Sequence, residues 1–262
     1  MLEVRFKHFD EKLLEIIEDS GLQIIEEDFK GEISYTIYCN KDDLNKFLDL
    51  IIDSYEIKDI QETGWETKWR DFIKPGNLTP NIRYIFEKED TTDPKTILIN
   101  PSLAFGTGTH PTTQLAATLL EEVCNNRSVI DIGCGSGILS IAAKLSGASK
   151  IYAFDNDSNA LINTKENIMQ NKADSIIIWA GSTDSLKTDF KVEIVVANII
   201  SSVLLSIQKD ILRISPEYVI VSGILSSEQD NFTSDFLKGL YSIDKFILKD
   251  DWLGIRYRRI HD

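Results

Sequence analysis

Three glycines at alternate positions after a short apolar strand constrain this chain more than any other feature. They stand in Val129-Ile130-Asp131-Ile132-Gly133-Cys134-Gly135-Ser136-Gly137, just before an apolar helix expected from Ile138 to about Ser146. Glycine lets the backbone pass beside a ligand where any side chain would clash. The first amides of the following helix then point toward that ligand. The segment therefore predicts a strand–loop–helix unit that binds a nucleotide-like molecule.

The spacing of the glycines distinguishes two classes of cofactor. A dinucleotide loop has its third glycine at the position where this chain has Ile138. Asp155 ends the next expected strand, about 20 positions after the loop, where an acidic side chain accepts hydrogen bonds from ribose hydroxyls. We therefore expect S-adenosylmethionine rather than NAD, bound by Gly133, Gly135, Gly137 and Asp155.

From residue 109 onward, expected strands alternate with helices, which is typical of a parallel α/β sheet. The expected strands are 128–132, 150–154, 175–179, 192–197 and 218–222, and the helices are 112–124, 138–146, 157–171, 201–212 and 227–239. Two more strands, 244–252 and 254–260, would form an antiparallel hairpin, which is not the ending of a plain Rossmann fold.

The first sixty residues predict a smaller α+β domain. Their apolar pattern gives the order βαββαβ, which is the ferredoxin-like arrangement. The expected strands are 2–9, 23–28, 33–39 and 57–61, and the helices are 10–20 and 42–52. We expect this domain at 1–61, a linker with Trp65 and Trp69 at 62–80, and the α/β domain at 81–262. A hairpin of 82–87 and 97–100 would open the second domain.

Charge restricts the partners of such a protein. The net charge is −14, and residues 1–60 carry 7 basic and 16 acidic side chains, so 7 − 16 = −9 falls in the smaller domain. An acidic surface repels phosphate backbones, which argues against direct nucleic-acid binding. It attracts basic partners, although a solvated acidic surface can also serve solubility alone.

Other sequence features indicate the compartment. No apolar run approaches the roughly 18 residues of a membrane span, and Met1–Phe6 lacks the layout of a signal peptide. The three cysteines (Cys39, Cys124 and Cys134) share no metal-ligand spacing. We therefore expect a cytoplasmic protein with reduced thiols, no metal and no membrane contact.

A second distinctive segment, Phe105–Thr113, combines glycines, hydroxyl side chains and the start of a helix. Such a segment can close over the amino-acid end of a ligand. We expect Phe105, Thr107 and Thr112 to contact the ligand there. His110 could act as a general base, but without a visible partner a structural role is the stronger expectation.

Asn198 follows the fourth strand of the alternating region. Ligands bind beyond the carboxyl ends of parallel strands, so its amide oxygen could accept a hydrogen bond from the ligand or from an incoming amine. Capping of the next helix is an equally good interpretation. Gly181 and Ser182, after the third strand, could hold an adenine edge or form a plain turn.

Two long motifs resemble one family. Asn100-Pro101-Ser102-Leu103-Ala104-Phe105-Gly106-Thr107-Gly108-Thr109-His110-Pro111-Thr112-Thr113 and Asp131-Ile132-Gly133-Cys134-Gly135-Ser136-Gly137-Ile138-Leu139 are similar to the ribosomal protein methyltransferase family (PrmA type). The likeness includes the tryptophan linker, Ala197-Asn198-Ile199 and Ser222-Gly223-Ile224-Leu225.

The resemblance implies a class I S-adenosylmethionine-dependent methyltransferase: a Rossmann-like seven-stranded sheet with a closing antiparallel hairpin, preceded by a substrate-recognition domain. Thr112, Gly133, Asp155 and Asn198 match the family's cofactor-binding positions, and Asn198 would serve catalysis. The implied substrate is a basic ribosomal protein, the large-subunit stalk-base protein L11, methylated on its N-terminal α-amine and on lysines. We expect the enzyme to be a monomer.

Three alternatives stay open. One is a related methyltransferase with another target; glutamine and adenine N-methyltransferases typically carry Asn-Pro-Pro-Tyr where this chain has Asn198-Ile199-Ile200-Ser201. Another is an NAD(P) oxidoreductase, which Ile138 and the closing hairpin disfavour. The third is a non-catalytic module that only binds the cofactor, and the presence of Asp155, Asn198 and the Gly/Thr segment argues against it.

Overall fold

The computed structural model describes residues 2–10, 12–13, 24–29, 32–39, 41–52, 55–59, 74–86, 93–100 and 106–260. Contacts divide the chain into two compact units, Met1–Ile73 and Lys74–Asp262. Residues 74–80, which we expected in the linker, belong to the second unit, whereas Trp65 and Trp69 lie outside the described residues.

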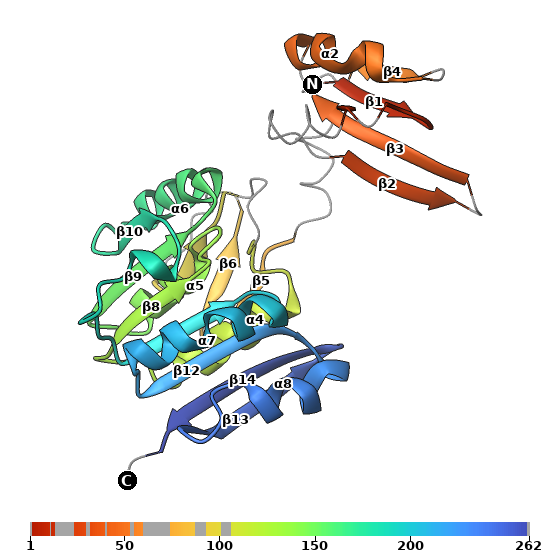
Figure 1. The fold of residues 1–262 in the computed structure, drawn as a ribbon. Coiled ribbons are helices and arrows are strands. Elements are labelled where there is room, and N and C mark those ends of the chain that lie inside the picture. The colour runs from red at the N-terminus through yellow and green to blue at the C-terminus, as the bar shows by residue number, and fades with distance from the viewer. Residues whose placement is uncertain are drawn as a thin grey trace. The chain divides into compact units, whose positions relative to one another are not determined.

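The first unit is built on a four-stranded antiparallel sheet in the order β2-β3-β1-β4. Its strands are β1 (Leu2–Phe6), β2 (Ile24–Phe29), β3 (Glu32–Cys39) and β4 (Glu56–Asp59) (Figure 1). This order confirms the ferredoxin-like prediction. The expected second helix is α2 (Lys41–Phe47) followed by a 3-10 turn, η1 (Leu48–Leu50). Most of the expected helix 10–20 lies outside the described residues.

Alternate residues of β1 form the core of this unit. Leu2, Val4 and Phe6 are buried, because successive side chains of a strand point to opposite faces. They pack with Leu13, Ile37, Cys39, Leu44, Phe47 and Ile51. The helical segments that supply Leu13, Leu44 and Phe47 therefore cover one face of the sheet.

The second unit contains a seven-stranded sheet in the order β10-β9-β8-β11-β12-β14-β13. The strands are β8 (Ser128–Ile132), β9 (Lys150–Asp155), β10 (Ile177–Ala180), β11 (Ile194–Asn198), β12 (Tyr218–Leu225), β13 (Tyr241–Lys249) and β14 (Trp252–Arg259). β14 pairs antiparallel with both β12 and β13, whereas β8–β12 are parallel. The Rossmann-like sheet with a closing antiparallel hairpin is thus confirmed.

Helices cover both faces of this sheet (Figure 1). They are α4 (Pro111–Glu121), α5 (Ile138–Leu145), α6 (Ser158–Gln170), α7 (Ser201–Ile214) and α8 (Gln229–Asp235), with the 3-10 turns η2 (Thr183–Ser185) and η3 (Ser226–Glu228). Helix α8 ends at Asp235, four residues before the expected end, because Phe236 has extended backbone angles. Among the described residues, each helix is too short or too polar to span a lipid bilayer.

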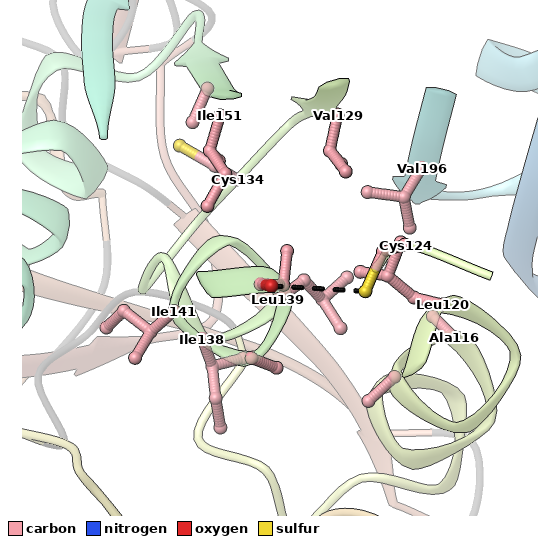
Figure 2. Close-up of a cluster of buried hydrophobic side chains, with 14 of the residues drawn as sticks. Ala116, Leu120, Cys124, Val129, Cys134, Ile138, Leu139, Ile141, Ile151 and Val196 are labelled. Atoms are coloured by element: carbon pink, nitrogen blue, oxygen red, sulfur yellow. Dashed lines mark hydrogen bonds between the residues drawn. The ribbon is translucent and has the colours of Figure 1, made fainter. Parts of the chain in front are cut away.

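Alternation along the strands creates two cores. Val129 and Val196 face α4 and α5, whereas Ile130 and Val195 face α7 and α8. Figure 2 shows the first of these cores, where Cys134 lies with side chains from β8, α4 and α5. The strand ends that carry the expected ligand-binding residues are therefore fixed from both sides.

The closing hairpin turns earlier than expected. We expected its turn at residue 253, but Lys249 pairs with Trp252 across a tight turn at Asp250 and Asp251. Asp250 has φ +52, a conformation that aspartate tolerates better than most residues. Trp252 consequently begins β14 instead of ending β13.

The hairpin expected from 82–87 and 97–100 is wrong. Strands β6 (Arg83–Ile85) and β7 (Thr96–Leu98) are parallel. The antiparallel partner of β6 is β5 (Gly76–Asn77), joined to it by a turn in which the Leu78 and Thr79 amides donate to the Ile82 carbonyl. We expected β6 to pair with the next apolar segment in the sequence, because the two-residue strand β5 carries no apolar pattern that would identify it as a strand.

Candidate functional site

A cavity of about 550 Å³ opens at the carboxyl ends of the parallel strands of the second unit. This volume falls in the range of pockets that hold nucleotide-sized molecules. Most of the lining comes from the ends of β8, β9 and β11 with the loops and helix starts that follow them. The rest comes from the segment that leads into α4, from β12 and from the start of β14. The lining residues are Gly106, His110, Thr112, Thr113, Gly133, Cys134, Gly135, Ile138, Leu139, Asp155, Asn156, Asp157, Ala160, Asn198, Ile199, Ile200, Val203, Gly223 and Trp252.

The glycine loop (Gly133–Gly137) is held by hydrogen bonds to the neighbouring strand β9. The amides of Gly133 and Cys134 donate to the Phe154 carbonyl at 2.9 and 3.1 Å. The Gly135 amide donates to Asp155 Oδ2 at 2.9 Å. Gly137 precedes α5 with φ +79, and a Cβ there would lie 2.8 Å from the Thr164 methyl group. The loop therefore requires glycine at this position.

Asp155 lines the cavity at the end of β9. Its Oδ1 accepts a hydrogen bond from the Asp157 amide at 3.0 Å, and its Oδ2 accepts the one from Gly135. Each carboxylate oxygen can accept a further hydrogen bond. The side chain can therefore bind a diol while it also fixes the loop, and Asp157 stands directly before α6.

Asn198 lines the cavity at the end of β11 and does not cap the next helix. The N-cap of α7 is Ile200, so the capping interpretation is wrong. Asn198 Nδ2 donates to Thr113 Oγ1 at 3.2 Å. Its Oδ1 is buried and has no hydrogen-bond partner among the described residues. An acceptor in this state is suited to a donor group of a ligand, because a buried acceptor without a partner costs free energy.

His110 combines a structural position with exposure to the cavity. It is the N-cap of α4, and its Nδ1 lies 2.8 Å from Thr112 Oγ1. Burial lowers the pKa of the imidazole, which favours the neutral ring at neutral pH. The ring meets Trp252 edge to face, with centroids 5.2 Å apart and an interplanar angle of 66°. Thr112, predicted to bind the ligand, lies beside this pair.

The loop after β11 forms part of the cavity wall, and the backbone of β12 packs closely against it. Gly223 has φ +88, and a Cβ there would lie 2.4 Å from the Ile199 carbonyl oxygen. The Ile199 side chain in turn lies over Gly133, whose Cβ would be 2.8 Å from Ile199 Cγ2. β12 can therefore reach the β11 loop only with glycine at 223.

The remaining predicted residues occupy other places. Thr107 Oγ1 lies 2.9 Å from Thr109 Oγ1, and Gly181 donates its amide to the Asp155 carbonyl. Ser182 caps η2 by accepting a hydrogen bond from the Asp184 amide. These residues and Gly137 are not among the lining residues, and Phe105 lies outside the described residues.

A buried carboxyl group lies beneath the site. Asp131 is 1% exposed, and its Oδ2 accepts a hydrogen bond from Ser140 Oγ at 2.7 Å. Its Oδ1 has no partner among the described residues. Burial raises the pKa of Asp131 to about 7, with a smaller upward contribution from the nearby Asp155 carboxylate and a downward one from the Ser140 hydrogen bond. Asp131 is thus a titratable group of the core, not of the cavity.

Sequence reasoning missed Trp252 and Thr113. Trp252 comes from the closing hairpin, whose contact with the cavity is set by the strand order. Thr113 was quoted only as part of the Gly/Thr segment, although its helix spacing from Pro111 placed it in the first turn of α4. Nothing local to Trp252 indicated that it would face His110.

Comparison with known proteins agrees with this architecture. The model of a family described as ribosomal protein L11 methyltransferase (PrmA) matches residues 22–260. A ribosomal protein L11 methyltransferase of Streptococcus equi subsp. zooepidemicus is 34% identical over 213 residues, covering 78% of this chain and 67% of that protein. One from Streptococcus pneumoniae is 30% identical over 247 residues, covering 91% and 75%.

A solved structure extends the comparison to three dimensions. The crystal structure of a ribosomal protein L11 methylase from Lactobacillus delbrueckii subsp. bulgaricus superposes with a TM-score of 0.65 at 28% identity. The match covers 72% of this chain and 100% of that chain.

Proposed function

This chain belongs to the ribosomal protein L11 methyltransferase (PrmA) family, and we propose that it methylates amine nitrogens of ribosomal protein L11 with S-adenosylmethionine as the donor. It is a methyltransferase by family and by fold. The acceptors we propose are the N-terminal α-amine and lysine side chains. The observation that supports this chemistry best is the buried, unpartnered Oδ1 of Asn198 in the wall of the cavity.

The cavity fits the proposed donor. Asp155 offers carboxylate oxygens for the ribose hydroxyls, and Gly133 and Gly135 leave room for close approach of the ligand to the backbone. Thr112 lies in the first turn of α4, where its hydroxyl can bind the amino-acid end. When bound, S-adenosylmethionine supplies an electrophilic methyl group on a sulfonium that is already a good leaving group.

Asn198 would orient the acceptor amine. An amine that donates one hydrogen bond to Asn198 Oδ1 keeps its lone pair free for the methyl carbon, and the bond to Thr113 fixes the amide plane. Correct orientation of two reactants can account for a large share of a rate enhancement. We therefore assign Asn198 a role in binding the reacting amine.

Deprotonation of the acceptor needs no strong base in this arrangement. An α-amine has a pKa of about 8 and a lysine about 10.4, and a partly desolvated pocket lowers the lysine value. The neutral His110 adds no positive charge that would oppose entry of a cationic substrate. Trp252 presents an aromatic ring on the same side of the cavity, and aromatic rings attract ammonium groups.

The acidic N-terminal unit would capture the basic substrate. Its sequence carries the excess of 16 acidic over 7 basic residues in 1–60, and opposite charge accelerates encounter at low salt. We propose that residues 1–61 recognise the ribosomal protein and that residues 81–262 bind the donor. A ribosomal substrate also implies reaction in the cytoplasm.

Mass spectrometry of purified ribosomal protein L11 after incubation with this protein and S-adenosylmethionine tests the proposal. The expected result is a series of methyl additions on the N-terminus and on lysines. Additions on another ribosomal protein would retain the enzyme and replace the substrate. Donor binding without methyl transfer to any ribosomal protein would overturn the proposed activity.

A further inference from the structure

Three asparagines spaced four residues apart form a polar stripe along α6. Asn163 and Asn167 lie on α6, and Asn171 directly follows its last residue; residues at this spacing share one helix face. Asn163 and Asn167 are buried, with 3% and 0% of their surface exposed. Buried amides require partners, and these asparagines find most of theirs on the backbone of other segments.

One of those segments is 98–100, which begins at the last residue of β7. The Leu98 amide donates to Asn171 Oδ1 at 2.8 Å, and Asn171 Nδ2 donates back to the Leu98 carbonyl at 2.7 Å. Two residues later, the Asn100 amide donates to Asn167 Oδ1 at 2.8 Å, and Asn163 Nδ2 donates to the Asn100 carbonyl at 3.1 Å. The side-chain amides thus bind backbone N–H and C=O groups of this segment that a neighbouring strand would otherwise bind.

The same face of α6 also binds the glycine loop. Thr164 Oγ1 donates to the Gly135 carbonyl at 2.6 Å, and Asn167 Nδ2 donates to the Ser136 carbonyl at 2.9 Å. A trans peptide group is planar, so fixing its carbonyl also fixes the direction of its N–H. Two consecutive peptide groups of the loop are therefore oriented by α6.

Asn167 joins the two segments through one side chain. Its Oδ1 accepts from segment 98–100 while its Nδ2 donates to the glycine loop. Ser136 links the glycine loop to the segment before α4, because its Oγ donates to the Gly106 carbonyl at 2.6 Å. Gly106 and Gly135 both line the cavity, whereas Asn167 does not. Asn167 can therefore influence a ligand only through these segments.

We propose that Asn167, together with Thr164, is a positioning residue that holds the glycine loop in the arrangement that binds the methyl donor. The inference rests on the proposed function, because it concerns affinity for S-adenosylmethionine. Asn171 provides a matched comparison: it anchors segment 98–100 from the same stripe, but its side-chain hydrogen bonds go to Leu98 and to the Asn167 carbonyl rather than to the glycine loop.

Isothermal titration of S-adenosylmethionine into the full-length Asn167→Ala and Asn171→Ala variants tests the proposal, with thermal unfolding of each protein measured in parallel. Both variants lose buried hydrogen bonds and should unfold at lower temperature. Only Asn167→Ala should raise the donor Kd, by about tenfold, with Asn171→Ala within about twofold of the wild type. In steady-state assays, Asn167→Ala should raise the donor KM more than it lowers kcat.

A second pair of variants keeps the proposal testable if Asn167→Ala does not fold. Thr164→Val nearly preserves shape and removes the hydroxyl, which contacts the Gly135 carbonyl at 2.6 Å and the Ala160 carbonyl of its own helix at 3.0 Å. Thr233→Val is its control, because Thr233 donates its hydroxyl within α8 to the Gln229 carbonyl. Thr164→Val should weaken donor binding and Thr233→Val should not.

The possible failures are distinguishable. Wild-type protein that binds no S-adenosylmethionine would overturn the proposed function, and the positioning role with it. Wild-type binding with equal Kd values for Asn167→Ala and Asn171→Ala would overturn the positioning role alone. If Asn167→Ala does not fold, equal Kd values for Thr164→Val and Thr233→Val have the same meaning.

Discussion

Asn198 at the end of β11 donates its side-chain amide to the Thr113 hydroxyl in the first turn of α4, 3.2 Å away. The bond joins two segments that are 85 residues apart in sequence. It also fixes the plane of the amide, because one Nδ2 hydrogen is engaged while the buried Oδ1 has no partner among the described residues.

Removal of this acceptor should slow methyl transfer more than it weakens donor binding. We expect Asn198→Ala to lower kcat by on the order of 100-fold, since misplacement of a reacting group carries a penalty of that size. Steady-state kinetics with ribosomal protein L11 would measure it. Thr113→Val, which retains the acceptor but loses its anchor, should have a smaller effect. An unchanged kcat for Asn198→Ala would contradict the assigned role.

The carboxylate of Asp155 should dominate donor affinity. Asp155→Ala removes a charged acceptor and the partner of the Gly135 amide, so we expect the Kd for S-adenosylmethionine to rise on the order of 100-fold. Calorimetric titration measures this directly, and circular dichroism should show an intact fold. Asp174→Ala makes the same charge change at an exposed position outside the cavity lining. Similar Kd values for the two variants would exclude the ribose contact.

Trp252 should affect the protein substrate more than the donor. It begins β14, whereas Asp155 ends β9, and β8, β11 and β12 lie between these two strands in the sheet order. We expect Trp252→Leu to raise the KM for ribosomal protein L11 about tenfold, through loss of the aromatic wall beside His110. The donor Kd should change by less than about twofold. A large increase in the donor Kd would place Trp252 on the donor side.

Asp131 should make stability depend on pH. Its pKa is about 7 in the folded protein and 3.8 without burial, so the folded state binds the proton more tightly between these values. The free energy of unfolding therefore falls as pH rises through this window. Asp131→Asn should remove this dependence, which we expect to amount to on the order of 4 kcal/mol across the whole window.

Urea unfolding of the wild type and Asp131→Asn at pH 5 and pH 8 measures the difference. Ser140→Ala provides the control, because loss of the Ser140 donor to the carboxylate should raise the pKa of Asp131 further and extend the fall to higher pH, which enlarges the difference between pH 5 and pH 8. Parallel pH profiles for wild type and Asp131→Asn would show that another group titrates in this range.

Charge reversal on the N-terminal unit should weaken substrate capture alone. Asp49 and Glu56 are exposed acidic residues of this unit. The double variant Asp49→Lys, Glu56→Lys should raise the KM for ribosomal protein L11 at low salt, with a smaller effect at high salt because screening reduces the attraction. The donor Kd should not change. Asp230→Lys with Asp235→Lys in α8 makes the same charge change on the other unit, and equal effects would contradict a separate recognition domain.

Much of the second unit could be predicted because its signals are local. The glycine loop, the strand ends at Ile132 and Asp155, and the helix after Pro111 follow from spacing and from turn and capping residues. The parallel pairing of β6 and β7 could not be predicted this way, because it depends on where the chain returns to the sheet.

Contacts within the site show the same limit. The stripe of asparagines that runs along α6 and ends just after it has helical spacing in the sequence, yet its function depends on segment 98–100, which is more than sixty residues distant. Trp252 reaches His110 only because β14 lies beside β12. Such contacts come from tertiary packing, which no local pattern encodes.

The order β12-β14-β13 also has a consequence for how the enzyme acquires activity during folding. β13 precedes β14 in the chain but is hydrogen-bonded to the sheet only through it, so β13 can join the sheet only when β14 is in place. The glycine loop does not depend on either strand, because its amides bond to β9, which pairs directly with β8. We therefore expect a folding chain to assemble its donor loop before Trp252 arrives, and to pass through a stage that can hold a cofactor but cannot yet accept a substrate.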